Sequence, residues 1–105
     1  MDKNVYIGDL MVDLQEKAVY KDNMDIEIRR KEYDLFEYLV RNHDRVVSRC
    51  ELLDHVWDYR KYIGSNTIDV HINRLRDKLK DKDLIRTIHG VGYQINTKKM
   101  KPKAS

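Results

Sequence analysis

The strongest constraint on the fold is the spacing of apolar residues in the segment TIDVHINRLRDKL, residues 67–79. Four apolar residues recur there at intervals of four, three and four positions: Ile68, Ile72, Leu75 and Leu79. At about 100° per residue these four lie within roughly 60° of one another, which predicts a helix with one buried face. Val70 lies almost opposite, among polar residues that we expect to face solvent. The exposed face of this helix therefore carries an isolated valine.

Two further helices are predicted upstream, because apolar doublets repeat four positions apart in two segments. The helices that we expect are residues 30–42, 49–57 and 66–80. Ser48 stands three residues before Glu51, a capping box that predicts the start of the second helix. For the third helix we expect the start at Asn66, with Asp69 three residues on, or at Ser65.

β-leaning segments flank the helices. Residues 5–28 contain four short runs separated by turn residues, the spacing of an antiparallel meander with one buried face. Residues 85–96 contain two such runs around Gly90 and Gly92, and we expect both glycines to supply the backbone freedom of a tight hairpin. Residues 98–105 are basic and have almost nothing to bury, so we expect a flexible tail.

The size and composition fit one small domain, residues 1–97, with a modest core. No apolar run approaches the roughly 18 residues of a membrane span, and residues 1–30 lack a basic segment followed by an apolar one. We therefore expect no membrane partner. The single cysteine, Cys50, can form no internal disulfide, which favours a reducing compartment and a cytoplasmic location. We interpret Cys50 as a small helix residue.

The charge is distributed unevenly. Residues 1–57 hold nine Lys and Arg against thirteen Asp and Glu, whereas residues 58–105 hold twelve against five. This skew favours a polyanionic partner, and nucleic acid is favoured over an anionic membrane because no amphipathic helix has a bulky aromatic face. The alternative is that the lysines only solubilise the surface.

The order of helix, helix, longer basic helix and hairpin describes a winged helix-turn-helix, an α+β fold. In this arrangement the last helix enters the major groove of DNA, and the hairpin reaches the adjacent backbone or minor groove. Thymine alone offers a methyl group in the major groove, so we expect Val70 to contact thymine there. We expect Asn73 and Arg74 to form hydrogen bonds with base edges. Two alternatives stay open: Val70 is an ordinary exposed apolar residue, or the third helix and hairpin form a protein-interaction module.

Three segments occur in an order and at separations that a generic winged helix would not show: YDLFEYLVRNHDRVVSRCELLDHVW, NTIDVHINRLRDKL and IRTIHGVGY. From about Tyr6 to Ile95, the chain resembles the C-terminal effector domain of OmpR/PhoB-type response regulators, the transcription factors of bacterial two-component systems. The resemblance implies a four-stranded antiparallel N-terminal sheet, three helices with the third as recognition helix, and a C-terminal wing. It also implies sequence-specific binding to double-stranded promoter DNA, commonly as two copies on direct-repeat half-sites.

By position, the resemblance assigns base reading to Val70 and Arg74, with Asn73 beside them. It implies phosphate contacts for Trp57, Thr67, His71, Arg76 and Tyr93. We also expect phosphate contacts from Asn66 and Lys78, and DNA contacts from Thr87 and His89 in the wing. Phosphate contacts set the register and most of the affinity, while base contacts set the preference.

The segment between the second and third helices, residues 58–64, corresponds to the family's loop that can touch RNA polymerase. The side chains we would test there are Tyr59, Arg60, Lys61 and Tyr62. The alternative is a solvated loop whose aromatic side chains fold onto the domain.

Three features depart from the family pattern. Arg29 stands where the family commonly has the threonine of a capping box with Glu32, so we expect that box to be lost and the first helix to be less well closed. His89 stands where the wing often carries arginine, so we expect weaker reading of the minor groove. The receiver domain with its phospho-acceptor aspartate is absent from this chain, which we expect to be either an excised effector domain or a protein that works without phosphorylation.

The residues do not favour catalysis. Asp69 and His71 diverge by about 200° on a helix and cannot share a metal or a substrate. His43, His55 and His89 have no companion at ligand spacing, and the GVG segment is a hairpin turn rather than a phosphate loop. We therefore expect no enzyme activity, no metal and no cofactor.

Overall fold

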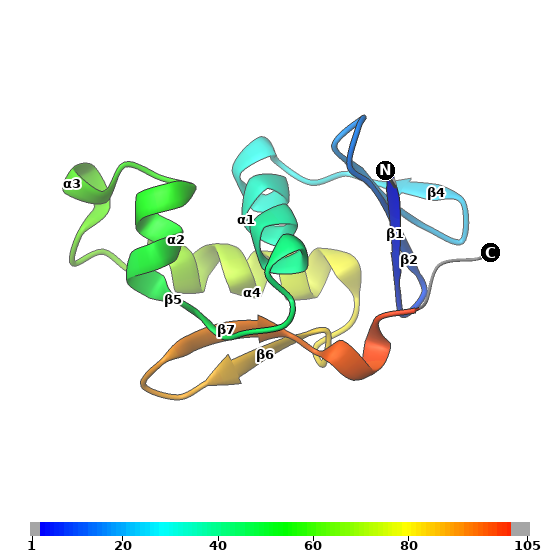
Figure 1. Ribbon diagram of the computed structural model, residues 1–105. Helices are drawn as coiled ribbons and strands as arrows, with labels where there is room; N and C mark the ends of the chain where they lie inside the picture. The colour runs from blue at the N-terminus through cyan, green and yellow to red at the C-terminus, as the bar shows by residue number, and fades with distance from the viewer. Residues whose placement is uncertain (1–2, 102–105) are drawn as a thin grey trace.

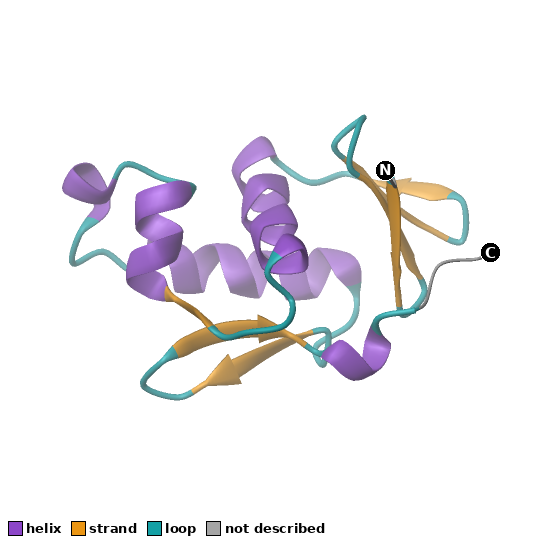
Figure 2. Cartoon of the chain, in the orientation of Figure 1, coloured by secondary structure: helices purple, strands orange, loops and turns teal. Residues whose placement is uncertain are grey.

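The structure, a computed structural model, describes residues 3–101, which form two small sheets and a set of helices (Figures 1 and 2). The elements in chain order are β1 (Asn4–Ile7), β2 (Leu10–Asp13), β3 (Ala18–Lys21), β4 (Met24–Ile26), α1 (Arg30–Arg41), β5 (Val47–Ser48), α2 (Arg49–His55), α3 (Tyr59–Tyr62), α4 (Thr67–Leu79), β6 (Ile85–Ile88), β7 (Gly92–Ile95) and the 3₁₀ helix η1 (Thr97–Lys99). The fold is the predicted winged helix-turn-helix with an N-terminal four-stranded antiparallel sheet. Within the described residues, no helix is both long and apolar enough to cross a membrane.

The N-terminal sheet has the strand order β1-β2-β3-β4, with every pair antiparallel. Alternation along the strands buries one face, which carries Ile7, Leu10, Val12 and Val19. The β3–β4 turn places Asp22 and Asn23 at positive φ, as a two-residue hairpin of type I′ requires. The sheet lies beside one end of α1 and α4 (Figure 1), and the four inward side chains join the same core as the helices.

The three predicted helices are present with slightly shorter ends. α1 begins at Arg30, as expected, although its cap differs from the prediction. Glu32 Oε1 accepts the backbone N–H of Arg29 at 2.9 Å, so the glutamate half of the capping box survives. The half that is lost is the side-chain acceptor, because arginine has only donors. At α2, Ser48 Oγ accepts the backbone N–H of Glu51 at 3.0 Å, which confirms the predicted cap.

The wing belongs to a three-stranded sheet of order β5-β7-β6. β5 is two residues long and was not predicted, because a pair of residues carries no periodicity. Gly90 has φ +77° and makes the hairpin turn, as expected. Gly92 has a different function from the predicted one: it carries no positive φ, and a Cβ at this position would lie 2.0 Å from the carbonyl oxygen of Val47. It is therefore the close approach of β5 and β7 that requires glycine there.

The C-terminal segment differs from the expected flexible tail over residues 98–101, while residues 102–105 lie outside the described part. Thr97–Lys99 forms η1, and Met100 pairs with Ile7 of β1. The backbone N–H of Gly8 donates to the carbonyl of Lys99 at 2.8 Å, and Lys99 Nζ reaches Asp81 at 2.8 Å. Met100 packs against the core, so one apolar residue and a short strand edge are enough to hold this basic segment.

Candidate nucleic-acid interface

The exposed face of α4 carries the three side chains predicted to read bases. The predicted stripe of α4, Ile68, Ile72, Leu75 and Leu79, is buried, with at most 3% of any side chain exposed. Asn73 and Arg74 are exposed, and Val70 is half-buried outside the core. Among residues 3–101, no side-chain hydrogen bond or ion pair holds Asn73 or Arg74. One helix face therefore presents an apolar, an amide and a guanidinium side chain that are free to meet a ligand.

A polar cluster ties the N-terminal half of α4 to α2 and to the wing. Asp69 Oδ1 accepts Arg49 Nε at 2.8 Å, and the Tyr93 hydroxyl donates to the same oxygen. Partial burial opposes ionisation of Asp69, but these two donors hold its pKa below the usual range. Burial beside this carboxylate raises the pKa of Tyr93. Asp69 thus joins three elements and does not cap α4, contrary to the expectation, and sequence reasoning missed its partner Arg49.

Arg76 lies on the side of α4 that faces the wing. Its Nη2 donates to the carbonyl of Ile85 at 2.6 Å and to Thr87 Oγ1 at 2.8 Å. The guanidinium carbon lies 5.8 Å from the centre of the Tyr93 ring. The structure therefore brings three predicted DNA-contact residues, Arg76, Thr87 and Tyr93, together where helix and wing meet.

A second group surrounds the first turns of α4. The Nδ1 of His71 lies 2.7 Å from the carbonyl oxygen of Thr67, and its ring packs against Trp57 in a T-shaped arrangement at a centroid distance of 4.8 Å. Lys31 Nζ lies 5.7 Å from the centre of the Trp57 ring. Asn66, the residue before the helix, is exposed and its side chain makes no capping bond. These predicted phosphate contacts form a half-exposed cluster beside the base-reading face.

Lys78 was predicted to contact a phosphate, but in the structure its ammonium group is paired within the protein. Its Nζ donates to Glu32 Oε1 at 2.6 Å, and the Glu32 side chain is fully buried. Burial opposes ionisation of Glu32, but the ammonium of Lys78 and the N–H of Arg29 hold its pKa below the usual range. A cation committed to a buried carboxylate is costly to withdraw, and we do not retain Lys78 as a phosphate contact.

Two exposed cations beside α4 were missed by the sequence reasoning. Lys82 lies with Asn73, Arg76 and Asp77 around one shallow groove, and a second groove joins Lys82 and Arg76 to Arg86 of β6. The signal was the basic skew of residues 58–105, but a skew does not say which cations stand free. The structure places these two along the path from the exposed face of α4 to the wing.

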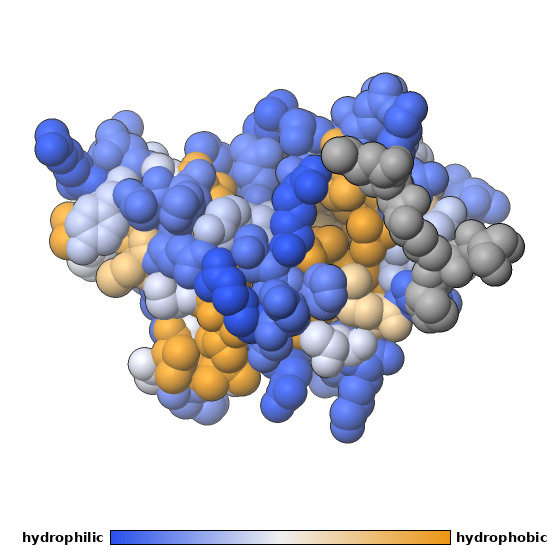
Figure 3. Space-filling model, in the orientation of Figure 1, coloured by the Kyte–Doolittle hydropathy of each residue, from blue (hydrophilic) through white to orange (hydrophobic). Residues whose placement is uncertain are grey.

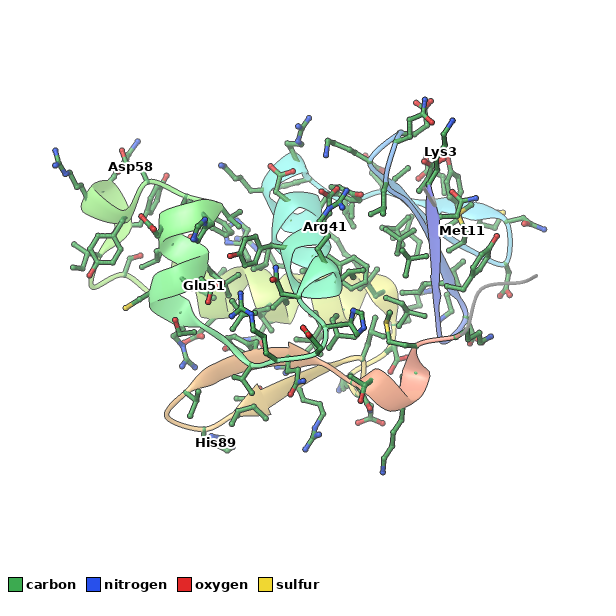
Figure 4. All side chains as sticks on the ribbon, viewed as in Figure 1. Lys3, Met11, Arg41, Glu51, Asp58 and His89 are labelled. Atoms are coloured by element: carbon green, nitrogen blue, oxygen red, sulfur yellow. The ribbon has the colours of Figure 1, made fainter. Side chains whose placement is uncertain are left out.

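The tip of the wing projects away from the helices, with His89 at its end (Figure 4). His89 is exposed, and Val91 beside it is 52% exposed. The space-filling view shows apolar surface over this hairpin (Figure 3). The wing therefore offers an imidazole and an apolar side chain rather than the arginine common in the family.

The segment 58–64 is partly helical instead of the expected loop. Asp58 caps α3 by accepting the N–H of Arg60 at 3.1 Å, which a four-residue helix without periodicity does not reveal in advance. Tyr59 and Tyr62 pack against the core, as the alternative interpretation had it, whereas Arg60 and Lys61 are exposed. α3, with Asp58 at its start, lies at the end of the molecule away from the N-terminal sheet (Figure 4).

Comparison with known proteins gives consistent matches. A family model described as "Transcriptional regulatory protein, C terminal" matches residues 23–95. The transcriptional regulatory protein VxrB of Vibrio cholerae is 38% identical over 94 residues, which are 90% of this chain and 38% of VxrB. The phosphate regulon regulatory protein PhoB of Rhizobium meliloti is 36% identical over 93 residues, 86% of this chain and 41% of PhoB. This chain thus spans about two fifths of the length of these relatives.

Solved structures match over nearly the whole chain. The DNA-binding domain of CpxR from E. coli is 28% identical with a TM-score of 0.78, covering 90% of this chain and 96% of that one. A streptococcal redox sensor that evolved from two-component response regulators is 34% identical with a TM-score of 0.77, covering 91% of this chain and 43% of that one.

Proposed function

Because the chain belongs to the family of C-terminal domains of transcriptional regulatory proteins, we propose that it binds double-stranded promoter DNA in a sequence-specific manner, as the effector domain of an OmpR/PhoB-type response regulator. The observation that carries the proposal is the free face of α4. Val70, Asn73 and Arg74 stand side by side on an element whose opposite face is fully buried. The CpxR domain, which is a DNA-binding domain, has the same fold and supports this function.

In the proposed complex α4 enters the major groove. Arg74 and Asn73 donate to base edges, and Val70 contacts a thymine methyl group. The wing reaches the adjacent backbone or minor groove with Thr87 and His89.

The phosphates on either side of the groove are contacted by two sets of side chains. One set lies near the start of α4: Trp57, Asn66, Thr67 and His71. The other set lies near the wing: Arg76, Lys82 and Arg86. Tyr93 is buried and its hydroxyl donates to Asp69, so we do not retain it as a phosphate contact. The second set combines the predicted Arg76 with the two cations that the structure adds, and the grooves that join these three side chains support a continuous path for the DNA backbone.

The test starts from selection of bound sequences out of a random duplex pool. With a selected duplex and a scrambled one, the ratio of the two affinities measures specificity. In Arg74→Ala, the difference in binding free energy between the two duplexes should shrink by about 1–3 kcal/mol, so that the ratio falls. The control Lys82→Ala should weaken binding to both duplexes alike. Wild-type affinity should fall steeply with salt, with a log-log slope of about 0.9 per neutralised phosphate.

Two results would contradict the proposal. An unchanged specificity ratio in Arg74→Ala would remove α4 as the recognition helix. A flat salt response, with binding to a protein partner retained, would favour a protein-interaction module instead.

The assembly on DNA and the contact with transcription machinery are part of the same proposal. We infer that two copies bind direct-repeat half-sites, which the selected sequences would display as a repeated motif in one orientation. We also infer that exposed Arg60 and Lys61 on α3 face RNA polymerase. Their replacement should then change transcription from a bound promoter without changing DNA affinity.

A further inference from the structure

One ion pair joins the recognition helix to the first helix through the protein interior. Glu32 lies in the first turn of α1 and Lys78 in the last turn of α4. The carboxylate is 0% exposed, and the Lys78 side chain is 33% exposed. Glu32 Oε1 accepts from both Lys78 Nζ and the Arg29 N–H, while Oε2 is buried without a partner in the described structure. The carboxylate therefore depends on Lys78 for most of its compensation.

Such a pair is a weak source of stability. The cost of removing two charges from water is of the same order as their attraction, so replacing a buried pair with apolar side chains is often neutral for folding. Buried polar pairs can instead select one arrangement among similar packings, because a rotated helix would leave the buried carboxylate alone. The aliphatic contacts of Ile72, Leu75 and Leu79 fix which face of α4 is buried, but they are not directional and restrain small rotations about the helix axis less strictly than a hydrogen-bonded pair does.

We propose that the Glu32–Lys78 pair is a positioning device for base reading: it sets the rotation of α4 about its axis, and thereby directs Val70, Asn73 and Arg74 at the DNA. The inference rests on the DNA-binding function proposed above. Lys78 follows Arg74 by one helical turn and lies on the same side of α4. A rotation that withdraws Lys78 from Glu32 therefore turns Arg74 by the same angle.

The remaining polar contacts of α4 lie on two sides: His71, on the side of Lys78, packs against Trp57 near the start of the helix. Asp69 and Arg76 project toward Arg49 and the wing, roughly opposite Lys78 on the helix. Asp69, His71 and Arg76 restrain the first and middle turns of α4, and the Glu32–Lys78 pair supplies the hydrogen-bonded restraint of its last turn toward α1.

The test separates positioning from folding and from phosphate binding. The main variant is the double substitution Glu32→Gln with Lys78→Met, which removes both charges and keeps an acceptor for the Arg29 N–H. We expect thermal unfolding close to wild type, because no buried charge is left unpaired. The specificity ratio between the selected and scrambled duplexes should nevertheless fall about tenfold, the size of one lost base contact. The single variant Lys78→Arg, which keeps a cation beside Glu32, should retain most of the wild-type specificity ratio.

The matched control is Asp34→Asn with Arg30→Met. These residues form an exposed pair on α1 at 3.0 Å, so the variant carries the same change of charge away from α4. Its specificity ratio should equal that of wild type.

The outcomes are distinct. A wild-type ratio in the Glu32/Lys78 double variant would reduce the pair to a structural contact and overturn the proposal. An equal loss of affinity for both duplexes, with a salt slope smaller by about 0.9, would make Lys78 a phosphate contact and also overturn it. Failure of the underlying DNA-binding function would show separately, as an unchanged ratio in Arg74→Ala.

Discussion

Replacement of Gly92 by alanine should destabilise the domain more than replacement of Gly90, although both glycines lie in the same hairpin. A Cβ on Gly92 would lie 2.0 Å from Val47 O, whereas real Cβ atoms essentially never approach closer than 3.0 Å. Since the obstacle is backbone, β5 and β7 must separate by roughly 1 Å. A Cβ on Gly90 would meet nothing within 4 Å, and only its φ of +77° disfavours alanine.

The magnitudes follow from these contacts. Forcing extra atoms into a packed site costs about 1–3 kcal/mol. β5 pairs with β7 through only two residues, and one of them, Ser48, caps α2, so loss of this cap adds about 1 kcal/mol. We therefore expect Gly92→Ala to lower the free energy of unfolding by about 2–4 kcal/mol. The positive φ should cost Gly90→Ala about 1–2 kcal/mol.

Urea unfolding followed by the fluorescence of Trp57, the single tryptophan, measures both variants. At about 4–8 °C per kcal/mol for a small domain, Gly92→Ala should also lower Tm by roughly 10 °C or more. Equal losses, or a larger loss for Gly90→Ala, would refute the assignment of Gly92 to a close strand approach.

Two further predictions follow from the described side chains. Val70→Ala should relax the preference at one T-containing position by about 1 kcal/mol with little loss of stability, as measured by duplex selection and urea unfolding; a large loss of stability would place Val70 in the core. Hydrogen bonds from Arg45 and Tyr38 lower the pKa of Glu51 to about 2 from 4.5. The folded state therefore gains stability from Glu51 above pH 4.5 and loses it as the pH falls toward 2. The free energy of unfolding, measured at pH 6 and at pH 3, should therefore fall less between these two pH values in Glu51→Gln than in wild type. An equal fall in both proteins would count against the contribution of Glu51 and its partners Arg45 and Tyr38.

Elements with a long periodic pattern were predictable from the sequence. α4 was predicted over residues 66–80 and is found at Thr67–Leu79, because four apolar residues at helical spacing leave one solution for the buried face. β5 and α3 were not predictable, since two and four residues are too few to show a period. The C-terminal segment was misjudged because its attachment depends on Met100 reaching β1, a contact between the two ends of the chain.

The same division holds for the candidate site. The exposure of Asn73 and Arg74, and the position of Val70 outside the core, followed from their angle to the buried stripe, which is a property of the helix alone. Whether each basic side chain is free or paired with a carboxylate could not be predicted in this way. Lys78 and Arg74 share one side of α4, yet Lys78 is bound to Glu32 while Arg74 is free.

The family, the order of the elements and the face of α4 that meets solvent were all predictable from the amino-acid sequence. These depend on periodicity within single elements and on the order and spacing of motifs along the chain, both of which are visible without knowing the tertiary contacts. Which basic side chains stand free on the proposed DNA-binding face depends instead on contacts between elements that are distant in the chain. The partner of Lys78 lies 46 positions away in α1, and a carboxylate attracts a cation strongly only where the fold has removed that carboxylate from water.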